Sequence, residues 1–419
     1  MDQTGSQVFV VPVKELHQFK LSWLLPWQVA KWKSKPTAYV KYLLEQEGDG
    51  SLLAALAAAG LSQNHAVNCF DYHGVASTLE LSVDLVNTTE ETLMRVGTLA
   101  FAYISLIRSK EVQQELWAEI RELHELQFHY PDELGGSAAS APFDFVQDIA
   151  CNSHYYPPEQ VLAADQLIYT EDFEGCQSIL RHMTVQNARL CLVSKDFESF
   201  CVSTEPWYGG KFLKCDTIKM DWKNKWMAVE TGQWEHIAKQ ENFRLPGKNS
   251  FIPKDLVMRH VPKESRPVEM NVGDSWCRAW FKQANLDQPK AAAAFCFYSS
   301  ALRTPKEVAL AHLYCKLLQQ ELKADAFQLR MAGARYQLDV AEGGNGIVLQ
   351  VIGFRDKMHL LAKKVSESLI SLNLLQSWRQ VKDQQEQHGL VDDEALSCFE
   401  KQHQTYFRVC PATLLGKAG

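Results

Sequence analysis

Alternating apolar and polar residues predict two β-strands in the first part of the chain. Apolar side chains stand at every second position over residues 19–25 and again over 79–85. In such a strand, successive side chains point to opposite faces, so each segment presents one apolar face. Apolar residues three and four positions apart instead predict helices over 36–45, 51–59 and 88–107.

The same order of elements is expected twice. In the first half, a helix ends at Ala59-Gly60 and is followed by strands, a helix and a further long helix. In the second half, a helix ends at Ala332-Gly333 and precedes a strand pair, a helix and a final helical segment at 393–407. This pattern predicts an internal repeat. The fold class is therefore α+β: two-layer sandwich domains, each an antiparallel-rich sheet with helices on one face, with the second copy incomplete.

Composition and charge narrow the classes of function. The net charge is −7, and no long cluster of Lys and Arg is present, so neither nucleic acid nor an anionic membrane is expected as a partner. The 11 cysteines include no Cys-x-x-Cys pair, and no signal peptide is recognisable. Scattered reduced thiols are typical of a cytoplasmic protein.

A glycine turn in EQEGDGSLLAALAAAG resembles a phosphate-binding loop at first sight. A phosphate loop follows a strand and places backbone N–H groups of a helix on the anion. Here a helix precedes the turn, no Walker lysine follows, and Glu45, Glu47 and Asp49 would repel phosphate. The turn is better explained as a helix-to-helix connection in which Ser51 caps the second helix.

Five longer segments identify a family. They are KPTAYVKYLLEQEGDGSLLAALAAAG, DIACNSHYYPPEQVLAADQLIY, EPWYGGKF, NSFIPKDL and WFKQANLDQPKAAAAFCF. Together they resemble the insulinase, or pitrilysin-like, family of metallopeptidases with an inverted zinc motif. That resemblance implies four homologous α+β domains around a chamber for peptides. It places 1–205 as the second, non-catalytic domain, 206–270 as an inter-domain connector, and 271–419 as a partial third domain.

The family's zinc site has no counterpart in this sequence. The motif His-x-x-Glu-His is absent, and so no metal ligand or catalytic residue is assigned, although zinc is the family's cofactor. The nearest group is His124, Glu125 and His129. The two histidines are five positions apart, about 140° around a helix of roughly 3.6 residues per turn, so they cannot share one ion.

A peptide exosite is the one family site that the chain retains. In relatives of this kind, the second domain binds the N-terminal end of a peptide by strand addition. The resemblance places its two segments on Gln46, Glu47, Gly48, Gly50, Ser51 and Leu52, and on His65, Ala66, Val67, Asn68 and Cys69. The family has Val-Gly-Gly where this chain has Ala66, Val67 and Asn68. The added side chains argue for a plain structural turn and edge strand instead.

Two classes of function follow. The first is a segment of a zinc metalloendopeptidase that forms part of the substrate chamber and is inactive without the first domain, which a longer chain or a partner chain supplies. The second is a non-catalytic peptide-binding or scaffolding protein that pairs with a full-length relative. Peptides are the expected ligands in both.

Overall fold

The computed structural model describes residues 4–72, 74–131, 141–258, 266–271, 277–283, 288–299 and 302–371. These residues form two compact units. The first contains the described residues up to 129 and from 141 to 248, and the second contains 130–131 and those from 249 onward. The unit boundary at 248 falls inside the predicted connector, whose first part packs with the first unit. The predicted domain limits at 205 and 270 themselves stay a prediction.

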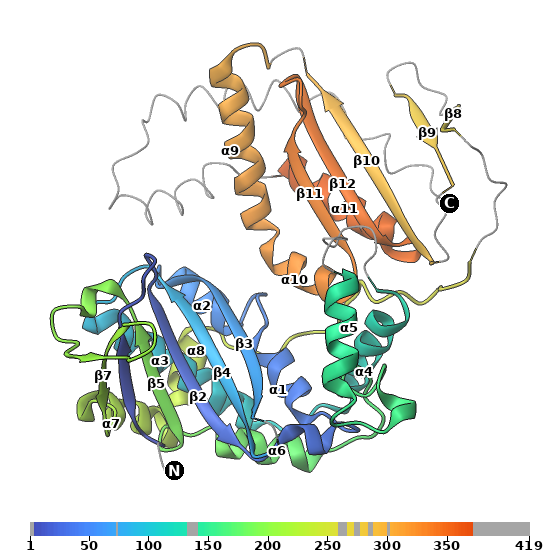
Figure 1. Ribbon diagram of the computed structural model, residues 1–419. Helices are drawn as coiled ribbons and strands as arrows, with labels where there is room; N and C mark the ends of the chain where they lie inside the picture. Colours follow the sequence, from blue (N-terminus) through green and yellow to red (C-terminus); the bar gives the residue numbers. More distant parts are fainter. Residues whose placement is uncertain are drawn as a thin grey trace. The chain divides into compact units, whose positions relative to one another are not determined.

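Within the described part of the first unit, seven strands form one sheet in the order β3-β4-β2-β5-β1-β7-β6 (Figure 1). All neighbouring strands are antiparallel except the parallel pair β1 and β5. The strands are β1 (Gln7–Val10), β2 (Gln18–Leu25), β3 (Ser62–Tyr72), β4 (Ala76–Leu85), β5 (Ala188–Val193), β6 (Ser203–Thr204) and β7 (Lys211–Cys215).

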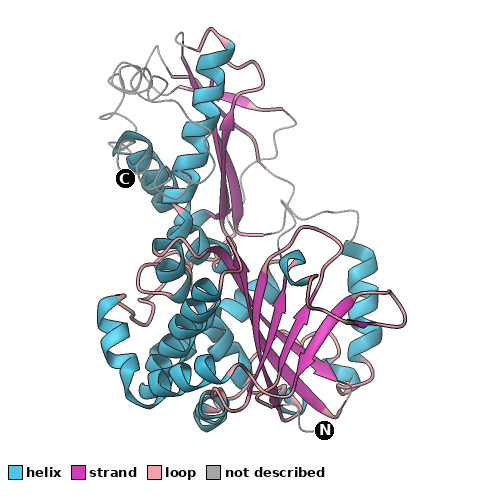
Figure 2. Cartoon of the chain, turned by 90° about the vertical axis from the view of Figure 1, so that its left-hand side faces the viewer, coloured by secondary structure: helices cyan, strands magenta, loops and turns pink. Residues whose placement is uncertain are grey.

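Helices cover one face of this sheet, and Figure 2 shows strands and the main group of helices as adjacent layers. Phe19, Leu21 and Trp23 on β2 are completely buried against this layer, while the residues between them are partly exposed. The predicted alternation is therefore confirmed. The helices are α1 (Pro36–Leu44), α2 (Leu52–Ala58), α3 (Glu90–Ser109), α4 (Gln114–His129), α5 (Ala141–Asn152), α6 (Phe173–His182), α7 (Met220–Ala228) and α8 (Trp234–Gln240).

Helix α7 is anchored in the first unit by Trp226. This side chain is fully buried and its indole Nε1 donates a 3.0 Å hydrogen bond to the Met94 carbonyl on α3. Its ring lies directly on Gly97, where a Cβ atom would come within 2.2 Å of Cζ2. The ring also packs on Phe101 and Phe19, with centroids 5.6 and 6.1 Å away. The absence of a side chain at Gly97 therefore allows the helix pair to close.

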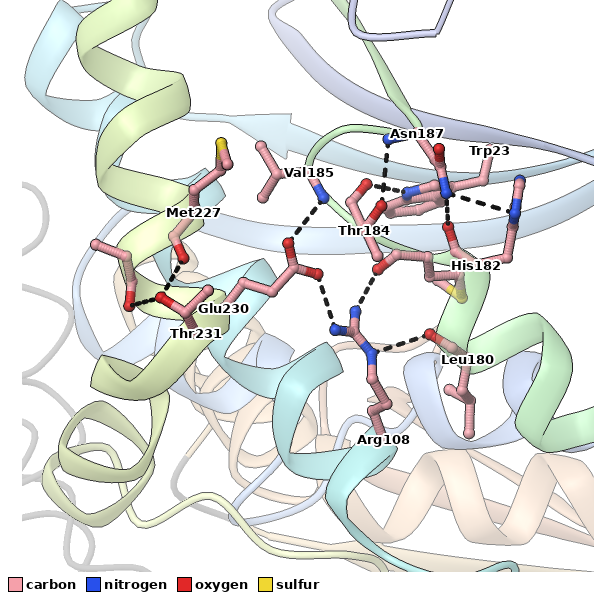
Figure 3. A network of polar contacts seen from close by, with 12 residues as sticks. Trp23, Arg108, Leu180, His182, Thr184, Val185, Asn187, Met227, Glu230 and Thr231 are labelled. Carbon is pink, nitrogen blue, oxygen red and sulfur yellow. Dashed lines mark hydrogen bonds and ion pairs between the residues drawn. The ribbon is translucent and has the colours of Figure 1, made fainter.

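A partly buried ion pair also attaches this segment to the first unit, as Figure 3 shows. Arg108 at the end of α3 forms a 2.8 Å ion pair with Glu230, which lies in the single π-helical turn Val229–Gln233 between α7 and α8. The Arg108 guanidinium also donates to the carbonyls of Leu180 and Met183, at 3.0 and 2.6 Å. The other Glu230 oxygen accepts from the Val185 amide at 3.2 Å. One charge pair thus joins α3, the end of α6 and the π-helical turn.

The second unit repeats the order found in the first. Helix α10 (Lys323–Met331) ends at Gly333, whose φ of +68° matches the +66° of Gly60 after α2. The hairpin of β11 (Arg335–Val340) and β12 (Gly346–Phe354) follows, and then α11 (Arg355–Ser371). The helical segment predicted at 393–407 lies outside the described residues.

The remaining elements of the second unit are the third strand of a small sheet, one further helix and a separate pair of strands. Strand β10 (Lys290–Tyr298) pairs with β12, which gives the order β10-β12-β11. Helix α9 (Pro305–Glu321) precedes α10. Strands β8 (Val268–Met270) and β9 (Ala279–Phe281) form a separate pair. An antiparallel-rich sheet with helices therefore describes both units, as the predicted fold class requires.

Replacing Gly97 by alanine tests the contact with Trp226. We expect a loss of about 1–2 kcal/mol in the free energy of unfolding, because overpacking outweighs the better helix propensity of alanine. Urea denaturation followed by circular dichroism measures this. Gly210→Ala is the matched control, since a Cβ atom there meets nothing within 4 Å. Equal stability of the two variants would contradict the packing argument.

Candidate peptide-docking surface

Strand β3 lies at one end of the large sheet, and it carries the second predicted exosite segment. It pairs with β4 on one side, and within the described residues no strand pairs with its other side. Each edge strand presents unpaired N–H and C=O groups to a possible further strand. His65, Ala66, Val67, Asn68 and Cys69 all lie in the middle of this strand.

The first predicted segment forms the turn between α1 and α2, next to β3. His65 links β3 to the helix just before the first segment, because its Nε2 lies 2.6 Å from the carbonyl oxygen of Leu44 at the end of α1. A carbonyl only accepts a hydrogen bond, so Nε2 carries the proton. The structure thus brings both predicted segments to the same edge of the sheet. Whether peptide binds there stays a prediction.

Asn242 and Arg244, which follow α8, contact the glycine turn and hold its backbone in place. Gly50 has a φ of +81°, and its carbonyl accepts a 3.0 Å hydrogen bond from the Arg244 amide. A Cβ atom at Gly50 would lie 2.4 Å from Cγ of Arg244 and 2.9 Å from the Asn242 carbonyl oxygen. Arg244 Nε also donates to the Asp49 carbonyl at 3.2 Å. The side of Gly50 where a side chain would stand is therefore filled by the protein itself.

The predicted helix-to-helix connection and the predicted cap at Ser51 are both confirmed. The Ser51 hydroxyl caps α2 by accepting from the Ala54 amide at 3.2 Å. Of the two glycines, Gly50 has the unusual backbone angle, whereas a Cβ atom at Gly48 meets nothing within 4 Å. Leu52 is fully buried as the first residue of the helix. The turn is a structural connection with Gly48 and Asp49 on its outer side.

Buried polar groups support the turn. Gln46 is 4% exposed and donates a 3.2 Å hydrogen bond to the Tyr42 carbonyl. The Tyr42 hydroxyl donates to the buried Glu119 carboxylate on α4 at 3.1 Å. Burial and then the Glu119 charge raise the pKa of Tyr42 above its ordinary value, so this hydroxyl stays protonated. The helix before the turn is thereby tied to α4.

The side chains that replace the family's glycines, Val67 and Asn68, lie on the two faces of β3. Val67 points into the core and is fully buried, while Asn68 lies on the opposite face of the sheet and is partly exposed. Strand addition uses N–H and C=O groups in the plane of the sheet, between these two faces. Burial and the Asp71 charge raise the pKa of Cys69 to about 11, so its thiol stays neutral.

His124, Glu125 and His129 do not gather around one point as the ligands of a zinc ion would. His124 Nδ1 lies 2.7 Å from the Gln166 carbonyl oxygen and therefore carries a proton, which leaves only Nε2 with a free lone pair. Burial lowers the pKa of His124. Glu125 forms an ion pair with Arg121 at 3.2 Å. Throughout the described parts of the chain, no three His, Cys, Asp or Glu side chains group as metal ligands would.

Comparison with known proteins gives the family. A profile described as the middle or third domain of peptidase_M16 matches residues 137–410. The chain belongs to the M16 peptidase family. This confirms the resemblance to pitrilysin-like metallopeptidases. The crystal structure of pitrilysin has a TM-score of 0.74 and 20% sequence identity, and the match covers 96% of this chain and 44% of that one.

Two relatives span the same region. Nardilysin of Homo sapiens is 25% identical over 372 residues, which are 87% of this chain and 31% of nardilysin. Insulin-degrading enzyme of Homo sapiens is 29% identical over 377 residues, 87% of this chain and 34% of that enzyme. The chain therefore spans about a third of the length of these relatives. Separately, none of the described helices is long and apolar enough to cross a bilayer.

Replacing Gly50 by alanine tests the internal role of the turn. We expect a loss of about 1–3 kcal/mol in the free energy of unfolding, because alanine is strained at positive φ and overlaps Arg244. Gly48→Ala serves as the control and should change stability by less than about 0.5 kcal/mol. Urea titrations of both variants provide the comparison. If Gly48→Ala costs as much as Gly50→Ala, the contact with Arg244 does not explain the glycine.

Proposed function

We propose that this chain is a non-catalytic part of an M16-type zinc peptidase, and that it binds extended peptides along the outer edge of β3. In this proposal it forms part of the wall of a peptide chamber. The zinc-binding first domain is supplied by a longer chain or by a separate chain. Within the described residues, β3 is the last strand of its sheet and no strand pairs with its outer side, and this is the single observation that carries the proposal.

The form of this edge suits strand addition. Strand β3 extends over 11 residues, which gives an incoming peptide several backbone hydrogen bonds. The bond from His65 to Leu44 holds the strand against the end of α1, and β4 holds it along its whole length. A prearranged edge lowers the entropic cost of binding a flexible peptide.

Family membership and the sequence support the absence of catalysis in this chain alone. The inverted motif His-x-x-Glu-His is missing from all 419 residues. In M16-type chemistry, a bound zinc ion polarises the peptide carbonyl and activates water. The described residues offer no ligand set for that ion. Peptide binding without cleavage is therefore the activity that we propose for the chain.

Peptides with selected N-methyl groups test strand addition without altering the protein. In an added strand, every second N–H of the peptide faces β3. Methylation of that alternate set should weaken binding about tenfold or more, because several hydrogen bonds are lost. Methylation of the other alternate set is the matched control and should leave the affinity nearly unchanged. Fluorescence anisotropy of a labelled peptide measures both, and equal affinities would count against strand addition.

A quenched-fluorescence peptide tests the absence of catalysis. The purified chain with added zinc should give no cleavage that a chelator abolishes, while an intact M16 peptidase in the same buffer provides the positive control. The expected result follows from the missing ligand motif. Chelator-sensitive turnover by the purified chain would refute the proposal that the catalytic domain must be supplied.

A further inference from the structure

The open face of the large sheet has an apolar end beside the β3 edge. Strand pairing aligns Leu24, Thr78 and Phe70 in one row across β2, β4 and β3. Residues aligned in this way point to the same face of the sheet. Leu24 is 50% exposed and Phe70 is 46% exposed. Tyr72, two positions beyond Phe70 on β3, is 53% exposed on the same face.

Beyond this row, most residues that β2, β4 and β3 place on the face are polar, and Glu80, Lys20 and Asp84 have polar partners. In the row next to that of Phe70, Glu80 on β4 aligns with Asn68 on β3. Glu80 also forms an ion pair with Lys20 at 3.4 Å. Further along, Asp84 accepts hydrogen bonds from Gln18 and Asn64 at 2.9 and 3.0 Å. Because these groups already have partners, they create no demand for a charged ligand.

A strand added to β3 would place its side chains beside these rows. Its residues would alternate between the two faces, and those on the open face would lie next to Phe70, Asn68, Ala66 and Asn64 in turn. The residue next to Phe70 would also reach Tyr72 diagonally. An apolar side chain there would cover exposed aromatic surface, whereas a polar one would leave that surface in water.

We propose that Phe70 and Tyr72, the two exposed aromatic residues of β3, form a specificity patch for the docked peptide. The patch selects an extended segment that carries one apolar residue beside Phe70 and polar residues at the following alternate positions, beside Asn68 and Asn64. This inference rests on the proposed function, because it needs a peptide on the β3 edge. The continuity of the patch with that open edge favours a peptide strand as its occupant.

Two labelled peptides test the patch. Both are short, extended and polar, and they differ at a single position that is phenylalanine in one and serine in the other. The wild-type chain should bind the phenylalanine peptide about threefold more tightly, as expected for one aromatic cross-strand pair. Such a peptide can slide by two residues, so its phenylalanine can reach the patch from several starting positions.

Three variants separate the patch from the edge. Phe70→Thr and Tyr72→Thr keep residues that suit a strand but remove the apolar surface, so the ratio of the two affinities should fall toward one. Val86→Thr, at an exposed apolar residue just after β4, is the control and should keep the wild-type ratio. Circular dichroism confirms that each variant is folded.

Each result has a defined meaning. A ratio that falls in Phe70→Thr and is retained in Val86→Thr supports the patch. Binding of both peptides with a ratio that Phe70→Thr and Tyr72→Thr leave unchanged overturns the patch but not docking on β3. A failure of the wild-type chain to bind either peptide overturns both the patch and the proposed function.

Discussion

The contact between Trp226 and Gly97 is the constraint on which the first unit depends. A buried indole occupies the place of a missing side chain on α3, and its N–H satisfies the Met94 carbonyl. Even one carbon atom added at Gly97 would lie 2.2 Å from Cζ2 of Trp226 and would overlap the ring. This contact holds α7, and the Arg108–Glu230 pair holds the turn that leads into α8. Together they make a late segment of the chain part of the core.

The position of the β3 edge follows from that arrangement. Beyond α8, Asn242 and Arg244 fill the inner side of the glycine turn and bond its backbone. The turn fixes the end of α1, and His65 joins that end to β3. A surface formed by residues 46–72 is thus supported by residues near 226 and 244. The β3 edge and the segment from Trp226 to Arg244 should therefore lose structure together if either is disrupted.

Local patterns predicted much of this fold, while contacts distant in sequence were not predictable. Alternation identified β2 and β4, and Ser51 was recognised as a helix cap because that signal lies within a few residues. By contrast, Asp49 and Arg244 are 195 positions apart, and no local pattern links them. Gly97 likewise lies in the middle of α3, where glycine lowers helix propensity, and it is explained by the ring of Trp226, which is distant in sequence. The exosite segments came from family resemblance, and their meeting at one edge came from the structure.

Hydrogen exchange along β3, with and without an extended peptide, is the most direct test of the account. Amides of β3 that face β4 are hydrogen-bonded and should be protected, whereas we expect those on the outer edge to exchange faster. The account predicts that peptide slows exchange at every second amide of Ser62–Tyr72 and leaves β2 and β5 unchanged. No change in β3, or protection centred on another part of the sheet, would contradict the claim that this edge binds peptide.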